Sequence, residues 1–201
     1  KYTGASTVLV DSEWDTLGMC PVALRTLIHE EYEKNEKGIL VNRCTGNLLK
    51  AIMPVHVLGN MTEMDELMEL ANTFQLDVIE DSTEALGSFY KGKHAGTFGK
   101  FGVFSFNGNK IISTGGGGVI VTNDKTLAKK AKHLTTQAKI SKLDYIHDEI
   151  GYNYRLVNIL AAVGVAQMEQ FPTFLEKKIS DTEYELIGKH EMLPVYKPRE
   201  K

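Results

Sequence analysis

Four polar side chains follow two strand-like segments of the sequence, and together they could present an amine and a carboxylate to one ligand. Asp81 and Glu84 follow the apolar run of "VIEDSTEALG", and Ser105 and Lys110 enclose the loop "SFNGNK" after the next apolar run. A lysine amine can form an imine with a carbonyl group and then carry a proton, while a carboxylate can keep a pyridinium nitrogen protonated. These residue types favour imine chemistry on a planar, electron-accepting cofactor.

Each of these features also has a simpler interpretation. An aspartate after a strand often caps the next turn, and a loop lysine is most often solvated. The glycine run at residues 115–118 allows close backbone approach, but such runs are as often flexible turns. Asn107 and Gly108 tolerate the tight backbone that a loop leading to Lys110 would need. Only the combination of these residues favours a site.

Two other kinds of site are disfavoured by the sequence. The segment "GSFYKGKH", residues 87–94, matches a phosphate-binding loop except at its last position, where His94 replaces the serine or threonine that would hold magnesium. Its inner residues are bulky and the following segment is not helical, which argues against a nucleoside triphosphatase. The six histidines lack metal-ligand spacing, so we expect no metal in the site.

Composition limits the partners. The chain has 201 residues, is 42% hydrophobic and carries a net charge of −3, so it can bury a core but offers no basic field for nucleic acid. Two cysteines, Cys20 and Cys44, fit a reducing compartment. Without a span-length apolar stretch or a signal-peptide pattern, we expect no membrane association and a cytoplasmic protein. The first apolar run begins almost at the first residue, and the sequence ends in charged residues and proline just after a long helical pattern. We therefore expect a larger parent protein.

The elements that must position these residues alternate along the chain. Apolar runs of strand length alternate with amphipathic stretches of helix length, which predicts an α/β domain with a mainly parallel sheet flanked by helices. The predicted strands are 6–11, 50–59, 76–81, 100–106 and 117–123; the predicted helices are 21–38, 63–75 with Thr62 as its cap, 124–134, 156–171 and 172–189. Such sheets bind ligands beyond the carboxyl ends of their strands, where Asp81 and Lys110 fall.

At this point the sequence resembles a known family. The segments "VIEDSTEALGSFYKGKHAGTFGKFGVFSFNGNKIISTGGGGVIVTND" and "HDEIGYNYRLVNILAAVGVAQMEQF" closely resemble the DegT/DnrJ/EryC1/StrS sugar-nucleotide aminotransferases, above all the branch that acts in legionaminic acid synthesis. The resemblance implies the large domain of a fold type I, pyridoxal phosphate-dependent transferase, incomplete here. Residues 1–171 would be part of this cofactor-binding domain, and residues 172–201 a connecting helix toward a mostly missing small domain.

The resemblance also implies roles for the residues after the two strands. Lys110 resembles the lysine that holds pyridoxal phosphate as an internal aldimine and that serves as acid and base for the proton shift. Asp81 resembles the carboxylate beside the pyridine nitrogen. Glu84 stands where the family places a polar residue, often Gln or His, near the phenolic oxygen of the cofactor. Ser105 matches the serine that binds the cofactor phosphate.

Further along the chain, the resemblance implies residues that complete the site. Asn153 in "GYNYR" resembles a residue that reaches the phosphate in the partner subunit, which implies a homodimer with a shared active site. Arg155 would contact the substrate, although it could equally belong to a surface loop. The implied reaction moves an amino group from glutamate to C4 of a nucleotide-linked 4-keto-6-deoxy-N-acetylhexosamine in bacterial surface-sugar (O-antigen and lipopolysaccharide) synthesis.

Two other functions stay open at this stage. A regulatory protein could use the same domain to sense the cofactor without turnover, and a plain structural α/β domain would make Asp81, Ser105 and Lys110 coincidences. The family's dehydratases, which carry a histidine in place of the lysine, are disfavoured by Lys110. The sequence also lacks the family's amino-terminal phosphate-binding turn and ring-stacking aromatic residue, so we expect this chain to bind the cofactor weakly and to turn over little.

Overall fold

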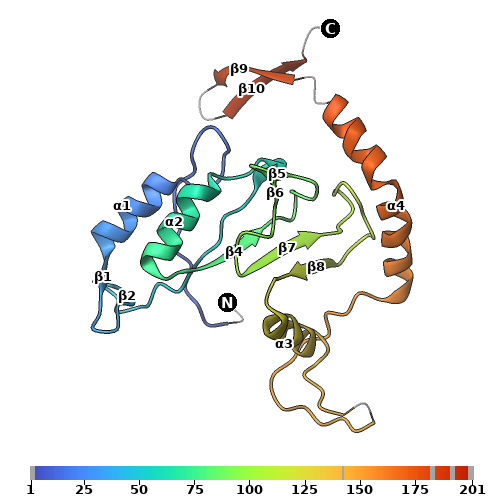
Figure 1. Cartoon of the computed structure of the whole chain (residues 1–201), viewed down its shortest axis with the longest axis horizontal. Coiled ribbons are helices and arrows are strands. Elements are labelled where there is room, and N and C mark those ends of the chain that lie inside the picture. The colour runs from blue at the N-terminus through green and yellow to red at the C-terminus, as the bar shows by residue number, and fades with distance from the viewer. Residues whose placement is uncertain (1–2, 142, 182–183, 191–192, 199–201) are drawn as a thin grey trace.

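The centre of the molecule is a four-stranded sheet with the strand order β3-β4-β7-β8. A computed structural model describes residues 3–141, 143–181, 184–190 and 193–198 (Figure 1). The strands of the sheet are β3 (Ala51–Ile52), β4 (Asp77–Asp81), β7 (Phe101–Ser105) and β8 (Gly118–Val121). The pairings β3-β4 and β4-β7 are parallel, and β7-β8 is antiparallel. The fold is therefore α/β with a mixed sheet in which two of the three pairings are parallel.

Helices and three small hairpins make up the other elements of the chain. The helices are α1 (Pro21–Glu31), α2 (Met64–Phe74), α3 (Lys125–Thr135), α4 (Asn158–Asp181) and the 3-10 turn η1 (Val57–Gly59). The hairpins are β1 (Tyr32–Lys34) with β2 (Leu40–Asn42), β5 (Phe89–Tyr90) with β6 (Lys93–His94), and β9 (Tyr184–His190) with β10 (Leu193–Pro198). Figure 1 shows α1 and α2 together on the β4 side of the sheet and α4 on the β8 side. No helix within the described ranges is both long and apolar enough to cross a membrane.

The main hydrophobic core lies between α1, α2 and the β3-β4 half of the sheet. Apolar residues recur in α2 at helical spacing, so that Met64, Leu67 and Leu70 are all buried on one face. They join buried residues of α1 and Val78 of β4 in one cluster. The chain leaves α2 through Gln75, whose left-handed backbone (φ 56°) ends the helix and directs the chain into β4.

Several predicted elements are confirmed. The strands predicted at 76–81, 100–106 and 117–123 correspond to β4, β7 and β8. The helix predicted at 124–134 is α3, and Asp124 caps it by accepting hydrogen bonds from the backbone N–H groups of Thr126 (2.7 Å) and Leu127 (3.1 Å). Pro21 occupies the first turn of α1, as expected.

The predictions for the amino-terminal third are partly wrong. The run 6–11 forms no strand, because no strand among the described residues pairs with it, and Leu9 is 87% exposed. The helix predicted at 21–38 ends at Glu31, since Tyr32 takes an extended backbone and buries its ring at the start of β1. The amphipathic pattern did not distinguish the end of the helix from the hairpin that follows.

The strand predicted at 50–59 and the Thr62 cap are also corrected. Only residues 51–52 form the β3 ladder, because Pro54 has no N–H group to continue it and η1 follows at once. Glu63 stands at the N-cap of α2 without a side-chain cap, while Thr62 is buried and contacts His56 at 3.4 Å.

The carboxyl-terminal helices differ as well. α4 runs without interruption from Asn158 to Asp181 and contains Pro172, where two helices were predicted to meet. The helix predicted to reach residue 189 is wrong, because Tyr184–His190 is strand β9. The boundary proposed after residue 171 falls inside α4, and the division into a cofactor-binding part and a connecting part stays a prediction.

Candidate active site

The carboxyl ends of β4 and β7 meet at one edge of the sheet. In the parallel register Asp81 lies opposite Val103, so Ser105 stands two residues beyond the same edge. Val55, after β3, forms a parallel bridge with Asp81, which brings the η1 turn to this edge too. The prediction that Asp81 and Lys110 follow neighbouring strand ends is therefore confirmed.

Lys110 and Glu84 form an ion pair at this edge. The Nζ of Lys110 lies 3.1 Å from Oε1 of Glu84, and the lysine side chain is only 15% exposed. The other carboxylate oxygen of Glu84 accepts a hydrogen bond of 2.8 Å from the backbone N–H of Leu58. This backbone bond and the bond from Lys110 lower the pKa of Glu84 below its ordinary value, against the opposing effect of burial.

Asp81 and Ser105 are both half-buried and engaged locally. Oδ1 of Asp81 accepts a hydrogen bond from the backbone N–H of Thr83 (3.2 Å), and Oγ of Ser105 accepts one from the N–H of Asn107 (3.2 Å). Each bond fixes the side chain near its strand end. The second carboxylate oxygen of Asp81 and the hydroxyl hydrogen of Ser105 take no part in these two bonds. Both of these atoms can therefore form a hydrogen bond with a ligand.

The donor set at this edge fits pyridoxal phosphate. A carboxylate suits the ring nitrogen, a primary amine suits the aldehyde carbon, and a hydroxyl suits the phosphate. Asp81, Lys110 and Ser105 supply these three groups from the ends of adjacent parallel strands. Lys110 is also mostly buried and paired with Glu84, so it is not a freely solvated loop lysine.

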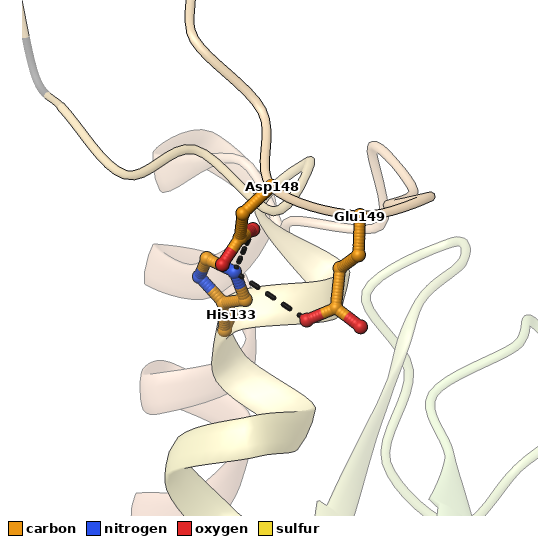
Figure 2. Close-up of side chains that lie close together, drawn as sticks. All are labelled: His133, Asp148 and Glu149. Carbon is orange, nitrogen blue, oxygen red and sulfur yellow. Dashed lines mark hydrogen bonds and ion pairs between the residues drawn. The ribbon is translucent and has the colours of Figure 1, made fainter.

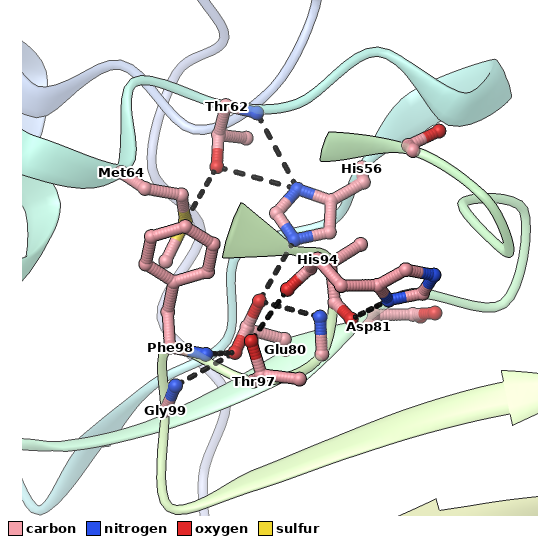
Figure 3. A network of polar contacts seen from close by, with 12 residues as sticks. His56, Thr62, Met64, Glu80, Asp81, His94, Thr97, Phe98 and Gly99 are labelled. Carbon is pink, nitrogen blue, oxygen red and sulfur yellow. Dashed lines mark hydrogen bonds and ion pairs between the residues drawn. The ribbon is translucent and has the colours of Figure 1, made fainter. Parts of the chain in front are cut away.

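A buried carboxylate lies directly behind Asp81. Glu80 is fully buried, and Figure 3 shows its carboxylate enclosed by His56 and by the loop after β6. It accepts hydrogen bonds from the backbone N–H groups of Gly96 (2.8 Å), Phe98 (2.6 Å) and Gly99 (2.6 Å), and its Oε2 lies 3.2 Å from Nε2 of His56. Burial acts to raise the pKa of Glu80, but the bonds from His56, Gly99 and Gly96 outweigh it and lower the pKa.

Sequence reasoning missed two parts of this arrangement. The burial pattern of β4 puts Val78 and Glu80 on the buried face, so the inward position of Glu80 was readable from strand alternation. The contribution of Leu58 had no signal in the sequence, because it is made by a backbone N–H group.

Asn153 and Arg155 lie on the segment between α3 and α4. Both are exposed, and the chain around them pairs with the end of α3 through the bridge between Thr136 and Asn153. The structure thus brings Asp81, Glu84, Ser105 and Lys110 to one edge of the sheet, while Asn153 and Arg155 lie on the segment that follows α3. Their roles stay predictions.

The other two motifs of the sequence have structural explanations. Residues 87–94 include the β5-β6 hairpin, in which His94 accepts a hydrogen bond from the backbone N–H of Gly87 (3.1 Å), so they form no phosphate-binding loop. In the glycine run, a Cβ on Gly117 would lie 2.6 Å from Leu156, and one on Gly118 would lie 2.4 Å from a carbonyl oxygen of β7. These two glycines allow close packing of the chain on itself.

A separate polar cluster joins α3 to the loop that follows it. His133 lies 2.7 Å from Asp148 and 3.6 Å from Glu149, as Figure 2 shows. The three side chains are close enough to share a metal ion, but Lys130 already forms an ion pair with Glu149. The cluster is an ion-pair network that holds Asp148 and Glu149 against α3.

The α/β fold is that of the large domain of fold type I, pyridoxal phosphate-dependent aminotransferases. The sequence profile of the DegT/DnrJ/EryC1/StrS aminotransferase family matches residues 1–185, and the chain belongs to this family. The cofactor that this membership implies is pyridoxal phosphate, which agrees with the donor set described above.

Individual relatives agree with the family assignment. The chain is 45% identical to GDP-perosamine synthase of Escherichia coli O157:H7 over 89% of its own length and 44% of that protein. It is 38% identical to the UDP-4-amino-4,6-dideoxy-N-acetyl-beta-L-altrosamine transaminase of Campylobacter jejuni (strain 81-176), over 76% of this chain and 40% of that protein. The solved structure of Helicobacter pylori PseC, an aminotransferase involved in pseudoaminic acid biosynthesis, superposes with a TM-score of 0.75 at 30% identity over 90% of this chain and 44% of that one. The chain thus spans less than half the length of these relatives.

Proposed function

We propose that this chain is the cofactor-binding part of an aminotransferase that moves an amino group from glutamate to the keto carbon of a nucleotide-linked sugar. The observation that carries the proposal is the partly buried Lys110, which forms an ion pair with Glu84. Lys110 follows β7 and Asp81 ends β4, and these two strands are adjacent and parallel. Pyridoxal phosphate supplies an electron-accepting ring and an aldehyde when it is bound. The relatives named above, which include a synthase and transaminases of amino sugars, support the same class of reaction.

The four residues at the sheet edge would divide the work. Lys110 would hold the cofactor covalently through Nζ and, as a free amine, would take and return the proton that moves during amino transfer. Asp81 would keep a proton on the ring nitrogen, Ser105 would bind the phosphate, and Glu84 would face the phenolic oxygen. Only Lys110 moves a proton in this scheme, and the other three hold the cofactor in one orientation.

The finer substrate assignment also belongs to this proposal. We infer amination at C4 of a 4-keto-6-deoxy-N-acetylhexosamine, as in legionaminic acid synthesis. The relatives' names give two nucleotides, GDP in the perosamine synthase and UDP in the altrosamine transaminase. A substrate screen should therefore pair each nucleotide with keto sugars that carry and lack the N-acetyl group.

The subunit arrangement is proposed on the position of Asn153. This residue is exposed and pairs with Thr136 at the end of α3, so it is accessible to a second copy in a homodimer. Arg155, two residues further on and also exposed, is the proposed contact to the charged substrate. A cytoplasmic location is part of the same proposal, because a cytoplasmic enzyme would meet both nucleotide sugars and glutamate there.

The deciding experiment is covalent trapping. The chain is mixed with pyridoxal phosphate, its visible absorbance is recorded, and borohydride is added to reduce the bond between the lysine and the cofactor. Peptide mass spectrometry should then find the reduced cofactor on Lys110. Trapping accumulates product with time, so it detects weak binding as well as tight binding.

A lysine at the opposite end of the same strand provides the matched control. Lys100 precedes β7 and forms an ion pair with Asp77, whereas Lys110 follows β7. Lys110→Ala should abolish specific labelling, and Lys100→Ala should leave it intact. Labelling spread over exposed lysines, unchanged by Lys110→Ala, would overturn the proposal. Trapping on Lys110, combined with a full-length parent protein that aminates no keto sugar in the screen, would instead favour a cofactor sensor.

A further inference from the structure

A strained turn lies beside the proposed site. Leu58, in the middle of η1, has a left-handed backbone (φ 54°, ψ 20°), which leucine rarely adopts. Its side chain is 72% exposed, so burial of the side chain does not explain this conformation. Strain of this kind persists only where the surrounding structure holds it in place.

Two hydrogen bonds hold the turn against the segment after β4. The hydroxyl of Ser88 donates to the carbonyl oxygen of Gly59 (2.7 Å), and the N–H of Leu58 donates to Oε2 of Glu84 (2.8 Å). Gly59 is itself left-handed (φ 88°), and a Cβ there would lie 3.2 Å from both the Glu84 carbonyl oxygen and the Ser88 hydroxyl. The turn and the 84–88 segment are therefore closely packed.

The same carboxylate reaches in the other direction to Lys110. Its Oε1 accepts from Nζ at 3.1 Å, so each carboxylate oxygen of Glu84 has its own donor. Glu84 thus links the turn after β3 to the loop after β7, on either side of Asp81. Lys178 of α4 adds a weaker favourable charge to the same carboxylate.

We propose that the strained Leu58 turn is a positioning device for Lys110: its N–H fixes the Glu84 carboxylate, and the carboxylate holds the lysine amine at one place on the sheet edge. The inference rests on the proposed reactive role of Lys110. A long lysine side chain otherwise samples many rotamers. Holding Nζ in one position raises the rate at which the amine, once it has lost its proton, condenses with a bound aldehyde to form an imine and release water.

The test removes the clamp on the turn without touching Glu84 or Lys110. Ser88→Ala deletes the hydroxyl that holds Gly59, so Leu58 can relax out of the left-handed region and withdraw its N–H. The control is Thr122→Val, because the Thr122 hydroxyl makes an equal bond of 2.7 Å to the Lys100 carbonyl oxygen at the far end of β7. A third variant adds Leu58→Gly to Ser88→Ala, since glycine keeps the left-handed turn without strain.

Two measurements follow each variant. Carboxyl carbon NMR, with the Glu84 signal assigned by its loss in Glu84→Gln, gives the pKa of Glu84; borohydride trapping with pyridoxal phosphate gives the labelling rate of Lys110. Ser88→Ala should raise the pKa of Glu84 toward its ordinary value and slow labelling by about fivefold, the factor that corresponds to one net hydrogen bond. Leu58→Gly should partly restore both quantities, and Thr122→Val should change neither.

The outcomes separate this inference from the proposed function. If the pKa of Glu84 and the labelling rate are the same in Ser88→Ala as in the unchanged chain, the positioning device is overturned. If the unchanged chain shows no labelling of Lys110, the proposed function fails, yet the NMR titration still decides whether the turn fixes Glu84. A rise in that pKa that Leu58→Gly does not reverse would overturn the role of backbone strain.

Discussion

Glu80 and His56 form a fully buried pair directly behind Asp81, with Oε2 of the glutamate 3.2 Å from Nε2 of the histidine. The backbone N–H of His56 also donates to the carbonyl oxygen of Asp81 (3.0 Å). The pair therefore fixes the backbone on both sides of the carboxylate that is proposed to meet the cofactor. Glu80 in addition holds three backbone N–H groups of the loop that follows β6.

Replacing this carboxylate should be costly. In Glu80→Gln an NH₂ group replaces one of the two oxygens. In one orientation this donor would face the Gly96 N–H and His56, and in the other it would face the N–H groups of Phe98 and Gly99, so it would meet backbone donors in either case. We expect the free energy of unfolding to fall by about 3 kcal/mol, as when one member of a buried pair is lost. Urea denaturation measures the change. Glu69→Gln, at an exposed position on α2, is the control and should change it by less than about 0.5 kcal/mol.

The same carboxylate should make stability depend on pH. The folded-state pKa of Glu80 lies below the ordinary value of a glutamate, so the unfolded chain binds its proton more readily. The stabilisation is therefore fully present above the unfolded-state pKa and is lost as pH falls through the folded-state pKa. Urea denaturation at a series of pH values should show a fall on the acid side that is smaller in Glu80→Gln. An equal fall in both proteins would contradict the prediction.

The sequence predicted the position of three polar residues at the sheet edge better than it predicted the elements around them. Asp81, Ser105 and Lys110 were placed together because parallel strands end at one edge of a sheet, a rule that needs only the order of the strands. The Glu84–Lys110 contact depends on the conformation of two loops, which no periodicity encodes. The end of α1 at Tyr32 was also not predictable, because the helical pattern of apolar residues continues into the hairpin. The early end of β3 at Pro54 could be predicted only if the strand that pairs with β3 were known.

Substitutions at two glycines test how tightly β7 and the loop that follows it are packed. A Cβ on Gly102 of β7 would lie 2.2 Å from the carbonyl oxygen of Gly96, so Gly102→Ala should destabilise the fold by at least about 2 kcal/mol. Gly108, expected from sequence to supply backbone freedom, has no positive φ and nothing within 4 Å of its Cβ position. Gly108→Ala should thus be neutral or stabilising by up to about 1 kcal/mol. Thermal unfolding of both variants checks the contrast, and equal losses would refute it.

Asp81 can be tested apart from Lys110, because the two are expected to act on different atoms of the cofactor. Asp81→Asn keeps the shape but loses the charge, so the ring nitrogen should no longer keep its proton. We expect borohydride trapping on Lys110 to persist while the half-reaction with glutamate, in the parent protein, slows by about 100-fold or more. Absorbance of the bound cofactor follows that half-reaction. Asp77→Asn, at the other end of β4 and paired with Lys100 on the surface, is the matched control and should react at the normal rate. An unchanged rate in Asp81→Asn would remove Asp81 from the site and leave the cofactor's nitrogen to another group.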